Sequence, residues 1–90
     1  MTAEDDIIRG QRAAAILADP LVQETFAALE AAYIKQWRTA PSLDAREALW
    51  LLLQNLETFR GQFGAYIRQG QAVLAEGNRR EKARKQDAEP

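Results

Sequence analysis

Apolar residues recur every three or four positions along most of this chain, which is the spacing that one face of an α-helix requires. The longest such pattern predicts a helix over residues 44–77, in which apolar or glycine positions alternate at intervals of four and three. That alternation is typical of a coiled-coil seam. The seam consists of Ala45, Leu49, Leu52, Leu56, Phe59, Phe63, Tyr66, Gly70, Val73 and Gly77. The other parts of the chain are expected to cover it.

A first helix is expected over residues 3–18. Thr2 is a plausible N-cap, and acidic residues follow it where the positive end of the helix dipole favours them. Asp5 and Arg9 stand four residues apart, a spacing that stabilises a helix by only about 0.3 kcal/mol. The inward face carries mostly small groups, so that this helix can lie close to another one: Ile7, Gly10, Ala14, Leu17 and Ala18.

A second helix is expected over residues 20–39. Asp19 can cap it, and Pro20 at the first helical position gives up only a donor that would be unpaired anyway. One face of this helix carries an apolar stripe for five turns. The stripe consists of Val22, Phe26, Leu29, Tyr33 and Trp37.

The reversal after the second helix is short. Pro41 ends that helix, because the residue before a proline is pushed out of the α region. Either Asp44, in a capping box with Glu47, or Ser42 then caps the third helix. A connection this brief favours antiparallel packing of the second helix on the third. The predicted fold is therefore all-α: a short first helix packed on an antiparallel hairpin of the second and third helices, with a coiled-coil-like seam.

The third helix is too long for the second to cover. At 1.5 Å per residue they span about 50 Å and about 30 Å, so the seam continues past the hairpin. Glycines weaken that part, each by about 1 kcal/mol of helix propensity. Two interpretations follow. Either the helix loosens or frays after Tyr66, or the first helix or a second chain approaches its backbone closely at Gly64 and Gly70.

The chain turns basic and loses its apolar period near its C-terminal end. We expect one helical domain over residues 1–78 and a helix-prone or disordered tail over residues 79–90, with disorder over residues 87–90. The Gly77-Asn78 pair would end the third helix. Two pairs of opposite charge at i,i+4 would instead extend it: Glu76 with Arg80, and Glu81 with Lys85.

Composition narrows the function classes. Among 90 residues there is no cysteine and no histidine, which removes disulfides, thiolate chemistry and histidine-based catalysis. The sequence carries no phosphate-loop motif either, so we expect no enzyme, catalytic residue, cofactor or metal site. A formal net charge of -1 argues against a dedicated nucleic-acid binder. An acidic N-terminus and the lack of a long apolar run predict a soluble, cytoplasmic protein without signal peptide or membrane span.

Trp50 and Leu51 lie off the seam and make the third helix apolar nearly all round. They contact either the first helix of the same chain or another molecule. Arg60 stands at the margin of the stripe, where its stem lies on apolar surface or its charge pairs with Asp5, Asp6 or a neighbouring chain. The candidates for a protein interface are Trp50, Leu51, Phe59, Phe63, Tyr66, Gly70 and Val73.

The tail contains the only concentrated basic feature of the chain. Phosphate groups are one partner for such a feature. Acidic residues interrupt the run, however, and no aromatic residue is interleaved with it, so a solvated tail is the other interpretation. The candidates for contact with an anionic partner are Arg79, Arg80, Lys82, Arg84 and Lys85.

Three segments together resemble a group of short helical proteins encoded in tailed-bacteriophage genomes near head and DNA-packaging genes. They are the run Gly10-Gln-Arg-Ala-Ala-Ala-Ile-Leu-Ala-Asp-Pro-Leu-Val, the pair Tyr33 and Trp37, and the run Ala45-Arg-Glu-Ala-Leu-Trp. The resemblance covers residues 4–78 and transfers no functional residue. It implies a viral or prophage origin and a role in virion assembly, packaging or host interaction, in the host cytoplasm or the virion.

The leading functional hypothesis is a non-enzymatic helical protein that self-associates, with the third helix pairing with another copy or a helical partner. One alternative is a module that binds nucleic acid or another anionic partner through the basic tail. The other is a small inhibitor of a host protein. No membrane or small-molecule substrate is expected as a partner.

Overall fold

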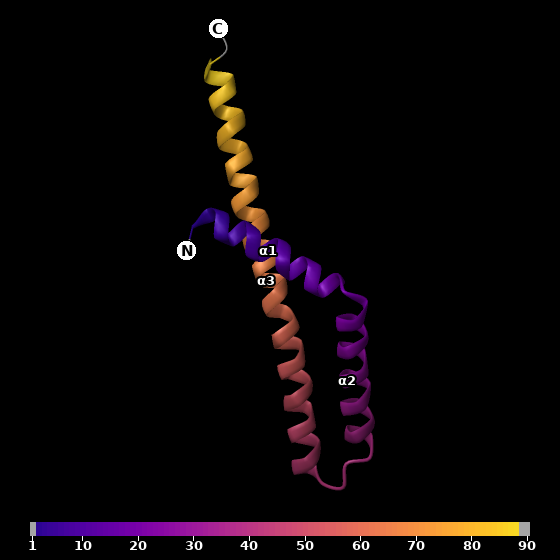
Figure 1. Ribbon diagram of the computed structural model, residues 1–90. Coiled ribbons are helices and arrows are strands. Elements are labelled where there is room, and N and C mark those ends of the chain that lie inside the picture. The colour runs from indigo at the N-terminus through magenta and orange to yellow at the C-terminus, as the bar shows by residue number, and fades with distance from the viewer. Residues whose placement is uncertain (1, 89–90) are drawn as a thin grey trace. The chain divides into compact units, whose positions relative to one another are not determined.

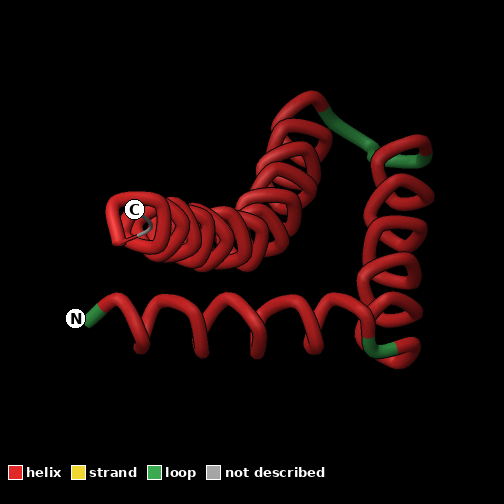
Figure 2. Tube along the Cα trace, turned by 90° about the horizontal axis from the view of Figure 1, so that it is seen from above, coloured by secondary structure: helices red, strands yellow, loops and turns green. Residues whose placement is uncertain are grey.

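The computed structural model describes residues 2–88 and consists of three helices joined by short loops (Figures 1 and 2). These are α1 (Ala3–Ala18), α2 (Pro20–Arg38) and α3 (Leu43–Ala88). The described residues contain no strand, which confirms the all-α prediction. Tertiary contacts group the chain into two compact units. We call Ala15–Gln62 the hairpin unit, and Met1–Ala14 with Phe63–Pro90 the crossing unit.

The first two helices begin at the predicted caps. The Thr2 hydroxyl accepts a hydrogen bond from the Asp5 backbone N–H at 3.1 Å, and the Asp5 carboxylate accepts one from the Thr2 N–H at 3.3 Å. This reciprocal arrangement is a capping box. At α2 the Asp19 carboxylate accepts a hydrogen bond from the Leu21 N–H at 2.8 Å, with Pro20 at the first helical position.

Ser42, rather than Asp44, caps α3. The Ser42 hydroxyl accepts a hydrogen bond from the Ala45 N–H at 3.1 Å, and its carbonyl accepts one from the Arg46 N–H at 3.1 Å. The helix therefore begins at Leu43, one residue earlier than predicted. Asp44 lies inside the first turn, where its charge still interacts favourably with the helix dipole.

In the hairpin unit, α2 runs antiparallel to the first part of α3 (Figure 1). The rings of Phe26 and Phe59 lie 6.2 Å apart, and the Arg46 guanidinium lies 5.4 Å from the centre of the Trp37 ring. Sequence distance between facing residues thus shrinks toward the loop, as a hairpin requires. Half-buried positions of α3 in this unit are Ala45, Leu49, Leu53, Leu56 and Arg60.

This half-buried set differs from the predicted seam at two positions. Leu53 and Arg60 face α2, whereas Leu52 and Phe59 are 42% and 59% exposed. A strict seven-residue repeat drifts by about 20° per heptad on a straight α-helix. A partner that follows α3 without supercoiling therefore contacts the neighbouring row of side chains, and two large seam residues are left facing outward.

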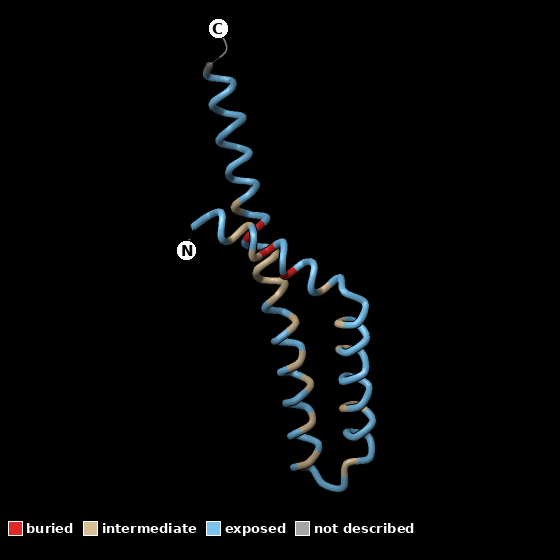
Figure 3. Tube along the Cα trace, in the orientation of Figure 1, coloured by how far each residue is buried: buried red, intermediate tan, exposed pale blue. Residues whose placement is uncertain are grey.

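In the crossing unit, α1 passes over α3 at a pair of glycines. A Cβ added to Gly10 would lie 2.8 Å from the Tyr66 carbonyl oxygen, and one added to Gly70 would lie 2.9 Å from the Asp6 carbonyl oxygen. Gly10, Ala13 and Gly70 are the buried residues of the described chain, and they gather at this crossing (Figure 3). Close backbone approach by the first helix is thus confirmed at Gly70. A Cβ at Gly64 would meet only the Arg68 side chain of the same helix, so the same expectation is wrong there.

Helix α3 continues through Ala88 instead of ending near Gly77. No described glycine has a positive φ, so the left-handed cap that commonly ends helices is not formed at Gly77. Ion pairs support the extension: Glu76 contacts Arg80 at 3.2 Å, as predicted, and Glu81 contacts Arg84 at 2.8 Å. The expected disorder over residues 87–90 is wrong for residues 87 and 88, which are helical, and residues 89 and 90 lie outside the described residues.

Candidate protein-interaction surface

Large apolar side chains of this chain remain exposed rather than forming a buried core. No residue of the hairpin unit is buried. Of the eleven large hydrophobic residues that are exposed among those described, nine belong to this unit. They are Ile16, Leu21, Leu29, Trp37, Leu43, Trp50, Leu51, Leu52 and Phe59. Exposed apolar residues mark an interaction surface where they form a contiguous patch, whereas scattered ones are normal, so their arrangement on the hairpin decides.

One side of the hairpin carries charge. The Arg60 guanidinium lies 3.2 Å from the Glu57 carboxylate and 3.5 Å from that of Glu30, which stands on the facing helix. The same guanidinium lies 5.1 Å from the centre of the Phe26 ring. Arg60 is therefore a rim arginine that lies against an aromatic ring and pairs with glutamates of the hairpin unit itself. We call this the charged side.

The opposite side of the hairpin carries no charge apart from Asp44, which lies at its outer margin in the first turn of α3. Positions along each helix advance by about 100° per residue, so the rows that flank the α2–α3 contact can be assigned to one side or the other. Glu30 and Ile34 line a shallow hollow with Gln54 and Glu57, which fixes which rows share the charged side. The other rows, which we call the uncharged side, consist of Thr25, Leu29, Ala32 and Gln36 of α2 and Ala48, Leu52, Asn55 and Phe59 of α3.

A second apolar feature lies near the loop of the hairpin. Trp37, Leu43 and Trp50 line an open hollow together with Arg46 and Glu47. Both indole rings are partly exposed, and the stacking of Arg46 on Trp37 occupies one ring face. The hollow is therefore amphipathic, and its charges of both signs distinguish it from the uncharged side.

The structure separates the predicted interface residues into two sets. Trp50 and Leu51 are each 52% exposed, and Phe59 is exposed as well. The other candidates belong to the crossing unit, where Gly70 is buried and three residues are half-buried: Phe63, Tyr66 and Val73. Sequence reasoning did not single out Leu29, because it was assigned to the buried stripe of α2. Its exposure follows from the row of α3 that α2 contacts.

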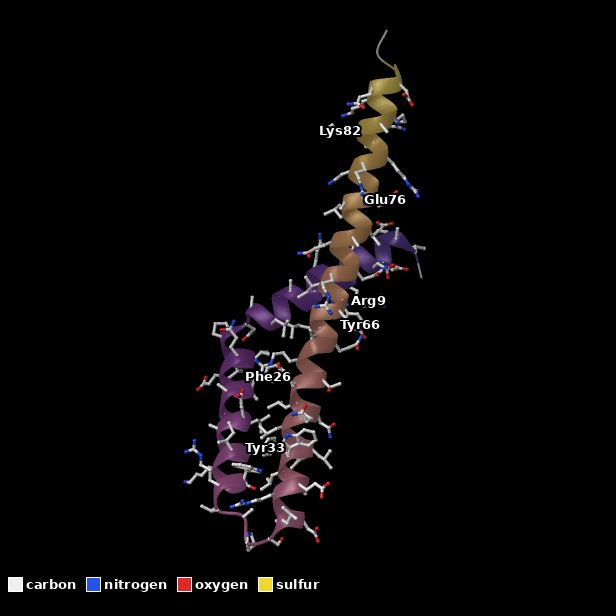
Figure 4. The ribbon with its side chains drawn as sticks, turned by 180° about the vertical axis from the view of Figure 1, so that it is seen from behind. Arg9, Phe26, Tyr33, Tyr66, Glu76 and Lys82 are labelled. Carbon is white, nitrogen blue, oxygen red and sulfur yellow. The ribbon has the colours of Figure 1, made fainter. Side chains whose placement is uncertain are left out.

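The crossing unit has its own polar contact beside the glycines. The Arg9 guanidinium lies 4.8 Å from the centre of the Tyr66 ring and donates a hydrogen bond of 2.7 Å to the Asp6 carboxylate (Figure 4). The predicted pairing of Arg9 with Asp5 is therefore wrong by one residue, because the Asp5 carboxylate is used in the capping box. The contact of Arg9 with Tyr66 joins α1 to α3, and the hydrogen bond to Asp6, within α1, holds the guanidinium in place.

The basic residues at the end of α3 are distributed around the helix. Arg79 and Arg80 both contact the Glu76 carboxylate, at 3.0 and 3.2 Å, and Arg84 contacts Glu81. At about 100° per residue, Arg80 and Arg84 stand about 100° and about 140° around the helix from Arg79, whereas Lys82 and Lys85 lie on the other side of it. Figure 4 shows side chains on both sides of this segment, from Glu76 to beyond Lys82. A single basic stripe, such as a phosphate backbone would follow, is therefore not formed by the described residues.

Comparisons with known proteins add no assignment to this geometry: no family model, curated protein or solved structure matches the chain. Within the described residues, no group of three or more acidic side chains is placed to hold a metal ion. None of the helices over residues 2–88 combines the length and apolar character needed to cross a membrane.

Proposed function

We propose that this chain is a non-enzymatic helical interaction protein that self-associates through its hairpin unit. The observation that carries the proposal is the exposure of nine large apolar residues in a unit that has no buried residue. Fully burying a leucine or phenylalanine side chain stabilises by about 1.5–3 kcal/mol. Side chains that are half exposed in one copy therefore leave on the order of 1 kcal/mol each to be gained on association.

The location of the proposed contact differs from the sequence-based hypothesis. That hypothesis placed it on the later part of α3, because α2 cannot reach beyond the hairpin. The structure supplies a partner there from the same chain, since α1 covers Gly70. The self-association we propose uses the hairpin instead, and the assembly role in a bacteriophage setting remains the biological context that the sequence resemblance suggests.

Sedimentation equilibrium tests this proposal. A mass above that of one 10.1 kDa chain at micromolar concentration is the expected result. Addition of 0.5 M salt is expected to leave the association intact, because apolar burial is not screened by ions. A single species of one chain across the micromolar range refutes self-association.

A second function for the basic end of α3 is not proposed. Three of its five basic side chains are held by glutamates of the same helix, and the five do not share one face. The remaining alternative, inhibition of a host protein, needs an exposed apolar helix face as self-association does. It becomes the better hypothesis only if the purified chain is monomeric.

A further inference from the structure

The apolar stripe between the two helices of the hairpin is incomplete. Phe26 and Tyr33 of α2, and Leu49 and Leu56 of α3, face one another but remain only half-buried. Two helices in contact enclose a line of side chains and cannot surround it, whereas four helices can enclose a core. A second pair of helices laid on one side of this hairpin would complete its core.

The uncharged side is the one on which another pair of helices can lie without an electrostatic penalty. It presents Leu29, Leu52 and Phe59, which are 38%, 42% and 59% exposed, and none of its eight residues carries a charge; Asp44 lies just beyond its margin. Burying the charged side would instead remove Glu30, Glu57 and Arg60 from water, and desolvation of paired charges often outweighs their attraction. The small residues Ala32 and Ala48 on the uncharged side allow helix axes to approach within about 8–10 Å.

A second copy of the chain is the occupant that this side fits. In a two-fold contact the same surface faces itself, so any charge on it would be desolvated twice, once in each copy. The uncharged side has no such charge, and Asp44 lies at its margin. Its extent is also suitable: helix α2 has 19 residues and is therefore about 28 Å long, and two adjacent helices are about 20 Å wide. The flat area of roughly 560 Å² per copy gives a total of about 1,100 Å², which is near the lower end of specific interfaces, about 1,200 Å².

We propose that two copies pack the uncharged sides of their hairpin units against each other about a two-fold axis and so form a four-helix bundle. This inference rests on the proposed function and specifies its partner, stoichiometry and face. Each copy contributes α2 and residues 43–62 of α3 to the bundle. The indole of Trp50 remains outside the contact.

Charge placed on the uncharged side tests the inference. Leu52→Lys replaces a partly exposed side chain, and Ala48→Glu adds a carboxylate at a position that is exposed in a single chain. Each is expected to weaken dimerisation at least 100-fold in sedimentation equilibrium, because the two-fold axis buries two like charges at once. Trp50→Lys is the matched control at 52% exposure, and a change of less than threefold is expected. Helix content by far-UV circular dichroism is recorded for all variants at the concentration used.

Each result bears on either the face or the self-association. A wild-type dimer that dissociates with Leu52→Lys and Ala48→Glu, but not with Trp50→Lys, supports the inference. If the wild-type chain is a dimer and both charge variants still dimerise, the uncharged side is not the contact, although self-association stands. If only Trp50→Lys loses the dimer, the contact lies at the hollow near the loop. A wild-type trimer overturns the two-fold bundle. A wild-type monomer overturns the proposed function itself.

Discussion

Replacing Gly70 by alanine is expected to separate the two helices of the crossing unit. The added Cβ would lie 2.9 Å from the Asp6 carbonyl oxygen and 3.3 Å from the Gly10 Cα, and both are backbone atoms that cannot turn aside. Real Cβ atoms are not found at the first of these distances, so α1 has to move. Overpacking of this kind destabilises by about 1–3 kcal/mol.

Gly70→Ala also has a stabilising effect, which must be separated from the cost of overpacking. Alanine in a helix interior is about 1 kcal/mol more favourable than glycine. Gly77 isolates this term, because it lies in the same helix and a Cβ there meets nothing within 4 Å. Gly77→Ala is therefore expected to stabilise by about 0.5–1 kcal/mol, and Gly70→Ala to be less stable than Gly77→Ala by about 1–3 kcal/mol.

Urea unfolding followed by far-UV circular dichroism, at one fixed protein concentration, measures this difference between the two variants. Native-state hydrogen exchange locates it: amides of α1 are expected to exchange faster in Gly70→Ala and to be unchanged in Gly77→Ala. The double variant with Gly10→Ala is expected to cost less than the two single effects combined, since helices already pushed apart accept a second methyl group. Equal stabilisation by Gly70→Ala and Gly77→Ala would refute the close crossing.

Three further outcomes are expected. Ser42→Ala should destabilise by about 1 kcal/mol in urea unfolding, whereas Asp44→Ala should cost less than half as much, because only the Ser42 hydroxyl caps α3; the reverse order would restore Asp44 as the cap. Deleting residues 78–90 should leave the sedimentation mass at that of two shortened chains, and loss of the dimer would place its contact on the end of α3. The midpoint of thermal unfolding should rise with protein concentration, because association stabilises only folded chains; a midpoint that is constant over a hundredfold range contradicts this.

The sequence predicted the helices well where local chemistry decides their limits. Thr2 and Asp19 act over three residues, and their hydrogen bonds depend on nothing distant in the chain. The C-terminal end of α3 was harder to predict because Gly77 can either end or continue a helix. The choice depends on whether it adopts a positive φ, and ion pairs around Glu76 favour continuation.

The candidate surface could be predicted only in part. The apolar character of Trp50, Leu51 and Phe59 is visible in the sequence, but the row of α3 that faces α2 is not. A seven-residue repeat fits two neighbouring rows almost equally well, and only the packed structure shows that Leu53, rather than Leu52, faces the hairpin contact. The lack of charge on one side emerges only after that row is known.

The two units differ in how much apolar surface their internal contacts bury, and this difference is the reason for placing self-association on the hairpin unit. Burial in the crossing unit centres on Gly10, Ala13 and Gly70, which remove little apolar surface from water but bring backbones into contact. That arrangement depends on shape and is satisfied within one chain. The hairpin unit holds most of the large apolar side chains and buries none of them. Further burial of these side chains requires contact with a second surface, and the uncharged side can accept one.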